Sequence, residues 1–174
     1  MNSNWPDNLS RQNEVSAYKE GMGVAMNLKK ILSPDTVWVD LKANTKEGII
    51  EEMVDRLLAA GKIKNRAAVL EAILKREEKM STGMQNGIAI PHGRSDSIET
   101  LTAAVGINKA GVDFDALDGQ PSTIFIMTLS PLRRAGPHMQ FLAEVSRLLT
   151  QPEAREKLLS ARTHAEIYTF LTGK

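Results

Sequence analysis

The chain has 174 residues, 42% of them hydrophobic, which predicts one domain with an ordinary apolar core. Its 22 basic and 21 acidic residues nearly balance, so the charge predicts no binding to nucleic acid and no attraction to an acidic membrane surface. The absence of cysteine excludes disulfides, thiol catalysis and Cys-ligated zinc, and no apolar run approaches the roughly 20 residues needed for membrane insertion.

The first 27 residues differ in composition from the rest. Asn, Ser and Asp dominate their first half, and they show little periodicity. We expect residues 1–27 to form an extension, with room for one short helix, outside a domain that spans 28–174. The polar start has no apolar region of the signal-peptide type, so the expected location is cytoplasmic.

The domain begins with a predicted strand and helix. The segment 36–41 alternates in the manner of a strand, which would place Val37, Val39 and Leu41 on one side. A helix is predicted over 46–60, with Thr45 as its N-cap and Gly61 as its stop. Its apolar face would consist of Ile49, Ile50, Met53, Val54, Leu57 and Leu58.

The remaining elements continue the alternation of helices and strands. Asn65 can cap a helix over 66–80, and the loop 81–87 leads to a short strand at 88–90. Further on we expect strands at 101–108 and 122–130, a connection at 131–137, and helices at 137–149, 152–161 and 164–172. The strand 122–130 is almost continuously apolar and should be central. This order predicts an α/β fold with helices covering a sheet.

Common catalytic and cofactor motifs are absent from the sequence. Gly87 and Gly93 have neither the spacing nor the lysine of a phosphate-binding P-loop, and no complete dinucleotide fingerprint occurs. The sequence has no HExxH motif and no GxSxG elbow. We therefore expect no metal and no cofactor, and any chemistry must rest on histidine, arginine and carboxylate side chains.

His92 is the first candidate for such chemistry. It follows the apolar segment Ile88–Ile90 and Pro91, which lacks an N–H and should end the strand, so the imidazole would be held on a rigid stem. Gly93 has no side chain, so a macromolecule could approach the ring closely. A neutral imidazole is available at pH 7 because its ordinary pKa is about 6.5.

A phosphoryl group on His92 would need positive charge and hydrogen-bond donors. Arg76, at the end of the preceding helix, has a suitable fork of donors, although pairing with the adjacent Glu77 or Glu78 is the alternative. His138 opens a helix, where free N–H groups favour anions. The hydroxyls of Ser81 and Thr82 could donate to His92 or to phosphate, or could bond their own loop.

The run STGMQNGIAIPHG, residues 81–93, closely resembles the active-histidine signature of enzyme IIA domains of the fructose/mannitol type in the bacterial phosphotransferase system, a family that includes nitrogen-regulatory enzyme IIA proteins. The resemblance extends over residues 28–173 and includes Arg76 before the histidine and His138 at a helix start. Gln85 departs from it, standing where the family commonly has glycine.

This resemblance implies a single α/β domain with a central mixed sheet flanked by helices on both faces. It also implies that His92 accepts and donates the phosphoryl group, while Arg76 and His138 stabilise it. The donor would be a histidine-containing phosphocarrier protein, and the acceptor an enzyme IIB domain.

Two alternatives remain open at this point. The domain could be a non-catalytic regulatory module whose binding to a target protein is switched by phosphorylation of His92. It could also be a small hydrolase with His92 as general base, Ser95 as nucleophile and Asp96 as the supporting carboxylate.

Overall fold

The computed structural model describes residues 28–133 and 136–173. The predicted extension over residues 1–27 lies outside the described residues, as do two residues of the connection before the helix predicted at 137–149. The described elements are η1 (Leu28–Lys30), η2 (Pro34–Thr36), β1 (Val37–Trp38), α2 (Lys46–Ala59), α3 (Arg66–Lys79), β2 (Ile88–Ala89), β3 (His92–Arg94), β4 (Thr102–Val112), β5 (Ser122–Ser130), α4 (Gly136–Leu149), α5 (Pro152–Ser160) and α6 (His164–Thr172). Within these ranges, none of the helices has the length and apolar character that a membrane span requires.

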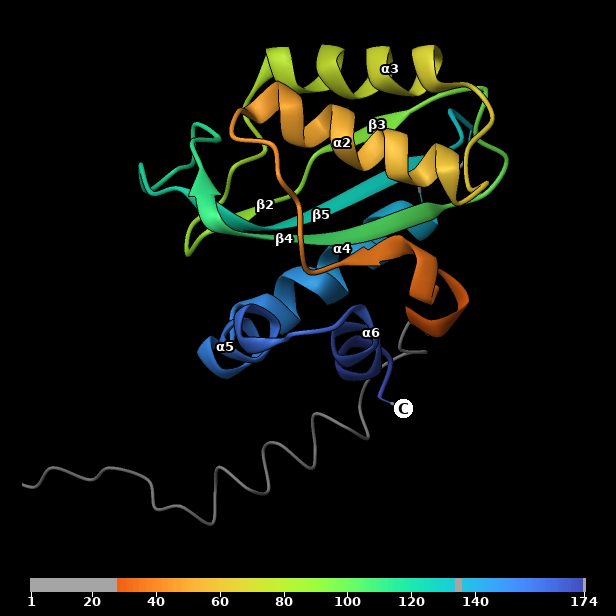
Figure 1. Cartoon of the computed structure of the whole chain (residues 1–174). Helices are drawn as coiled ribbons and strands as arrows, with labels where there is room; N and C mark the ends of the chain where they lie inside the picture. The colour runs from red at the N-terminus through yellow and green to blue at the C-terminus, as the bar shows by residue number, and fades with distance from the viewer. Residues whose placement is uncertain (1–27, 134–135, 174) are drawn as a thin grey trace, which may run out of the picture.

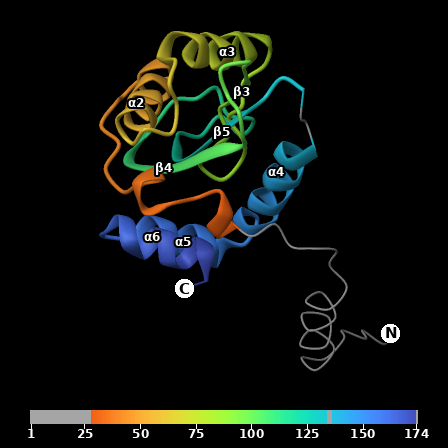
Figure 2. The same ribbon diagram turned by 90° about the vertical axis from the view of Figure 1, so that its right-hand side faces the viewer.

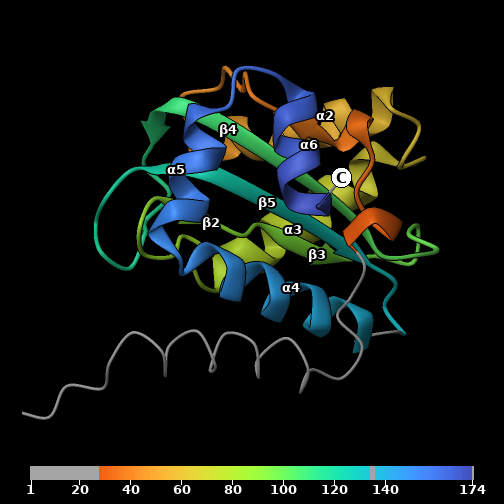
Figure 3. The ribbon, with the colours of Figure 1, turned by 90° about the horizontal axis from the view of Figure 1, so that it is seen from below.

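The five strands form one mixed sheet between two layers of helices (Figure 1). The strand order is β1-β4-β5-β2, and β3 also pairs with β5. Only the β4–β5 pair is antiparallel; the other three pairings are parallel. Helices α2 and α3 cover one face, and α4, α5 and α6 cover the other (Figure 3). The predicted α/β class, the mixed sheet with helices on both faces and the central position of β5 are confirmed.

The alternation of side chains along β5 divides the apolar core in two. Phe125, Met127 and Leu129 pack with residues of α2 and α3, whereas Ile124 and Ile126 pack with residues of α4, α5 and α6. Successive side chains of a strand point to opposite faces, so an apolar strand between two helical layers can fill both cores.

The predicted helix ends agree with the structure. The side chains of Thr45 and Asn65 accept hydrogen bonds from backbone N–H groups in the first turns of α2 and α3. Gly61 follows α2 with φ +66°, a conformation that favours glycine. One detail is wrong: Leu58, expected on the buried face of α2, is 38% exposed.

The first strand is shorter than predicted, and its side chains divide differently. Only Val37 and Trp38 pair with β4, although the N–H of Leu41 still donates to the carbonyl of Ile107. Val37 and Val39 face the core of α4–α6, but Leu41 lies in the other core together with Trp38. The regular alternation therefore ends before Leu41.

The strand before the candidate histidine does not end where the sequence suggested. Strand β2 breaks at Ile90–Pro91, but β3 then resumes pairing with the same strand, with His92 opposite Thr128. The Pro91 carbonyl still accepts a hydrogen bond from the Thr128 N–H. An edge strand tolerates proline because its outer side needs no ladder hydrogen bond. His92 is thus the first residue of a strand rather than the residue beyond one.

Gly93 is needed for helix packing rather than for an open surface. It is buried, and a Cβ added to it would lie 3.0 Å from the backbone nitrogen of Ile73 and 3.1 Å from the carbonyl carbon of Ala72. Both atoms belong to α3, which lies against β3 (Figure 2). The absent side chain therefore lets α3 approach the strand that carries His92.

We predict that Gly93→Ala lowers the free energy of unfolding by about 1–3 kcal/mol, because its methyl group must push against helix backbone. Chemical denaturation followed by circular dichroism measures this loss. Gly136→Ala is the matched control, since a Cβ there meets no atom within 4 Å. Equal stability of the two variants would contradict the packing role of Gly93.

Candidate functional site

Three residues from three elements meet at one end of the sheet. Arg76, in the last turn of α3, donates its Nε–H to Nε2 of His92 over 3.1 Å. The ring of His138, in the first turn of α4, lies 5.5 Å from the ring of His92, centroid to centroid, at an interplanar angle of 49°. The fold therefore brings together the three residues that the sequence singled out.

Two contacts fix the tautomer of His92. Its Nδ1 lies 2.8 Å from the carbonyl oxygen of Ile90, which can only accept a hydrogen bond. Its Nε2 receives the Nε–H of Arg76, and a guanidinium can only donate. We therefore assign the proton to Nδ1 and the lone pair to Nε2. The nitrogen that can act as a nucleophile is the one that faces Arg76.

The electrostatics of the site favour neutral imidazoles. Burial lowers the pKa of His92 below its ordinary value, and the nearby charge of Arg76 acts in the same direction against the hydrogen bond to Ile90. His138 is only 6% exposed, and burial, with smaller contributions from His92 and Arg94, lowers its pKa to about 4. Both rings are therefore neutral at pH 7, and His92 can offer a lone pair.

Arg76 does not form the alternative ion pairs considered from the sequence. One of its terminal nitrogens donates to the carbonyl of Met80 over 2.9 Å, which holds the guanidinium beside the His92 ring. Glu77, the adjacent carboxylate that was considered as an ion-pair partner of Arg76, instead binds Thr82 and Lys46. The charge of Arg76 is therefore directed toward His92.

The buried carboxylate of Glu77 fastens the loop that follows α3, and sequence reasoning missed this role. It accepts hydrogen bonds from the N–H and hydroxyl of Thr82, at 2.9 and 2.5 Å, and lies 2.8 Å from the Lys46 ammonium. Burial alone would raise the pKa of Glu77, but the hydrogen bonds from Lys46 and Thr82 hold it below its ordinary value. The available signal was its spacing, since Glu77 continues the buried stripe of Val69 and Ile73.

The hydroxyls of Ser81 and Thr82 donate elsewhere than to His92. Ser81 donates to the carbonyl of Phe114 over 2.6 Å, and Thr82 donates to Glu77. Both residues therefore anchor the loop in this structure. Ser95, considered as a nucleophile, is buried and shares a hydrogen bond with Ser97, so no contact links it to His92 as a hydrolase would require.

Two further polar residues lie beneath the site. Thr128 is the register partner of His92, and Ser130 is that of Arg94. Both hydroxyl oxygens are buried without a hydrogen-bond partner among the described residues, as is Nδ1 of His138. These hydroxyls were not predicted from the sequence, although two hydroxyl residues at alternate positions in an apolar strand were the available signal.

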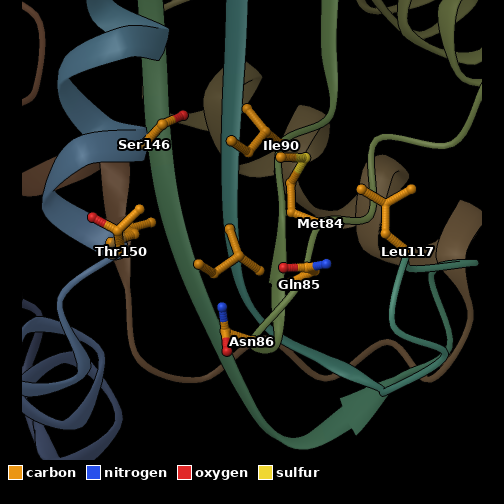
Figure 4. A pocket seen from close by; sticks show the side chains of 9 residues that line it. Met84, Gln85, Asn86, Ile90, Leu117, Ser146 and Thr150 are labelled. Atoms are coloured by element: carbon orange, nitrogen blue, oxygen red, sulfur yellow. The ribbon is translucent and has the colours of Figure 1, made fainter.

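The pocket shown in Figure 4 adjoins the site through Ile90, whose carbonyl accepts the Nδ1–H of His92. That pocket encloses about 310 Å³ between the loop of Met84 to Asn86, the exposed side chain of Leu117, and Ser146 and Thr150 from the C-terminal end of α4 and the residue after it. None of the three site residues lines it. Within residues 28–133 and 136–173, no group of three His, Asp or Glu side chains is placed to hold a metal ion.

The sequence matches a known protein family over nearly all of the described residues. The sequence model described as "Phosphoenolpyruvate-dependent sugar phosphotransferase system, EIIA 2" matches residues 30–174. A fructose-specific EIIA component of Haloferax volcanii is 39% identical over 73% of this chain and 82% of its own length. A fructose-specific EIIABC component of Bacillus subtilis is 38% identical over 82% of this chain, which spans only 22% of that larger protein.

Solved structures show the same fold. The nitrogen regulatory protein IIA-Ntr of Neisseria meningitidis superimposes with a TM-score of 0.77, at 30% identity, over 83% of this chain and 99% of that one. The Escherichia coli enzyme IIA for mannitol, solved in complex with phosphorylated enzyme IIB, gives a TM-score of 0.70 over 82% of this chain and 98% of that one. At 21% identity, the second likeness concerns the fold alone.

The lowered pKa of His138 predicts a pH dependence of stability. Between about pH 4 and 6.5 the unfolded chain binds a proton at this residue that the folded chain does not. The free energy of unfolding is therefore not reduced by His138 above about pH 6.5. As the pH falls to about 4, it decreases by up to about 3 kcal/mol, because the unfolded chain takes up this proton first.

Urea unfolding of the wild type and of His138→Asn at pH 7 and pH 4.5 measures this contribution. The wild type should lose more stability than the variant as the pH falls. His164→Asn, which removes a histidine outside the site, is the control. A wild type and His138→Asn with parallel pH profiles would contradict the lowered pKa.

Proposed function

Because the chain belongs to the EIIA 2 family of the phosphoenolpyruvate-dependent sugar phosphotransferase system, we propose that it carries a phosphoryl group on Nε2 of His92 and passes it to a second protein. The observation that carries this proposal is the pair of contacts on His92. Ile90 holds the proton on Nδ1, and Arg76 sits at the lone pair of Nε2. The imidazole is thus both a prepared nucleophile and a neighbour of a fixed positive charge.

The transfer itself is an exchange of one P–N bond for another. The lone pair of His92 Nε2 attacks the phosphorus in line, and the bond between phosphorus and the donor nitrogen breaks as the new one forms. The Arg76 N–H that donates to Nε2 is released by this step and can donate to a phosphoryl oxygen instead. His138, whose ring centroid lies 5.5 Å from that of His92, adds a second polar group beside the transferred one. These groups supply positioning and charge stabilisation.

Exposed apolar side chains surround these residues and suit transient docking of a protein partner. Met80, whose carbonyl holds Arg76, is 69% exposed, and Met139, next to His138, is 62% exposed. Leu132, whose carbonyl accepts from Arg94, is also exposed. Methionine adapts to partners of different shape. The proposed donor is a histidine-containing phosphocarrier protein, and the proposed acceptor is an enzyme IIB domain.

The proposed unit is the domain over residues 28–174, with residues 1–27 as an extension. The match of the family model to residues 30–174 supports this division. The proposed phosphoryl transfer would take place in the cytoplasm, where the phosphocarrier would bind this domain.

A regulatory role is the second candidate, in which the phosphorylation state of His92 sets the affinity for a target protein. The 30% identity to a nitrogen regulatory protein over nearly its whole length favours this variant. Both candidates use the same chemistry at His92. Affinity capture with phosphorylated and unphosphorylated protein tests for a target whose binding depends on phosphorylation. Transfer of the phosphoryl group to an enzyme IIB domain tests for the transport role.

We predict that incubation with phosphoenolpyruvate, enzyme I and the phosphocarrier adds one acid-labile phosphoryl group of about 80 Da, and that His92→Ala abolishes the addition. Intact-mass spectrometry measures it. His164→Ala is the matched control, because this histidine lies at the start of α6 and pairs with Asp40. The same mass increase in His92→Ala would refute the assignment of His92 as the phosphorylated residue.

We predict that Arg76→Ala slows phosphoryl transfer by 10- to 1000-fold, because one charged donor to the phosphoryl group is lost. Arg76→Lys should restore part of the rate, since it keeps the charge but not the forked donor. Quench-flow measurement of transfer from the phosphorylated carrier provides the rates. Unchanged transfer in a folded Arg76→Ala variant would remove the arginine from the mechanism.

A further inference from the structure

The floor of the site is polar where the neighbouring core is apolar. Along the face of β5 that points toward α4, Ile124 and Ile126 are followed by Thr128 and Ser130. On α4, His138 continues the buried stripe of Phe141, Val145 and Leu149. Since this stripe packs on the face of Ile124 and Ile126, His138 lies over the polar end of the same face. His92 and Arg94, the register partners of the two hydroxyl residues, border it on β3.

Three hydrogen-bonding atoms in this layer have no partner among the described residues. They are the hydroxyl oxygens of Thr128 and Ser130 and the Nδ1 of His138. Thr128 is completely buried, Ser130 is 1% exposed and His138 is 6% exposed. Unpartnered buried polar atoms are unfavourable, and valine and alanine would fill the same space without that cost. These three atoms are therefore available for hydrogen bonds that the described residues do not make in the unmodified site.

Among residues 28–133 and 136–173, the groups that face His138 are positive or neutral when His92 is unmodified. From β3 come His92 and Arg94, which both disfavour its protonation, and Arg76 of α3 donates to Nε2 of His92. Strand β5 contributes only the two hydroxyls. On α4 itself the acidic residue is Glu144, almost two turns farther along the helix. A phosphoryl group on His92 would bring nearly two negative charges into this setting.

On the basis of the proposed phosphorylation of His92, we propose that His138 binds a proton from solvent when His92 is phosphorylated, and that the hydroxyls of Thr128 and Ser130 accept the hydrogen bond of its Nδ1–H. The Nε2–H of the resulting imidazolium is then free to face the phosphoryl oxygens. No bond to phosphorus changes in this step, and the proton returns to solvent when the phosphoryl group leaves. Thr128 and Ser130 are thus positioning residues that act through His138.

Titration of His138 by nuclear magnetic resonance tests this inference. The full chain carries His164→Gln, so that His92 and His138 are its only histidines. It is labelled with ¹⁵N-histidine and phosphorylated with phosphoramidate, a small donor that needs no partner protein. Mass spectrometry and ³¹P spectra establish phosphorylation at His92 before the titration. A protein that phosphoramidate modifies but the phosphocarrier does not would count against the proposed function alone.

We expect His138 to titrate between pH 6.5 and 8.5 in the phosphorylated protein, an upward pKa shift of about two units or more. In Thr128→Val/Ser130→Ala the shift should be smaller by about one unit. In Thr128→Ser/Ser130→Thr, which keeps both hydroxyls, it should be retained. Without phosphorylation, Thr128→Val should also raise the thermal midpoint or leave it unchanged, because it removes an unpartnered polar atom.

Two results would overturn the inference. One is a His138 that stays neutral throughout this pH range in the phosphorylated protein. The other is an equal shift in the hydroxyl-free and hydroxyl-retaining variants, which would leave Thr128 and Ser130 without the proposed role. If the hydroxyl-free variant does not fold, the protein with both hydroxyls still shows whether His138 becomes protonated. Ser130→Ala alone then shows whether a hydroxyl contributes to the shift.

Discussion

The site depends on the way one imidazole is held from both ends. The Ile90 carbonyl accepts the proton of Nδ1, and the Arg76 guanidinium occupies the lone pair of Nε2. Each contact alone would select the same tautomer, and together they leave no hydrogen-bonding freedom to the ring. A nucleophile with its lone pair already directed at a cation needs little reorganisation when an anionic group arrives.

Several features of the fold support this arrangement. Gly93 lets α3 approach β3 closely, which brings the last turn of the helix, and with it Arg76, to the ring. Glu77 draws the next loop onto the same helix through Thr82. Pro91 interrupts the edge strand without releasing it from β5. The site is therefore an extension of the packing between α3 and the edge of the sheet.

The sequence predicted the elements that depend on local signals. Thr45 and Asn65 capped their helices as expected, because a cap needs only its own first turn. His92 as a strand residue was missed, since pairing with β5 across Pro91 is a long-range interaction. The buried hydroxyls of Thr128 and Ser130 were also missed, because their burial depends on where α4 lies. Arg76 could be selected from its place at the end of the helix before the loop, but whether it would contact His92 or Glu77 depended on how α3 lies against β3.

The two contacts that hold His92 come from one continuous stretch. Arg76 and His92 are sixteen positions apart, and Ile90 lies between them. His138, in contrast, lies on α4, which follows two further strands, β4 and β5. In the proposed mechanism, the contacts that prepare His92 as a nucleophile therefore come from residues 76–92, while the charge balance around the phosphoryl group also depends on α4. Under the proposed function, substitutions in α4 would change how long the phosphoryl group stays on His92 without changing the contacts of its Nε2.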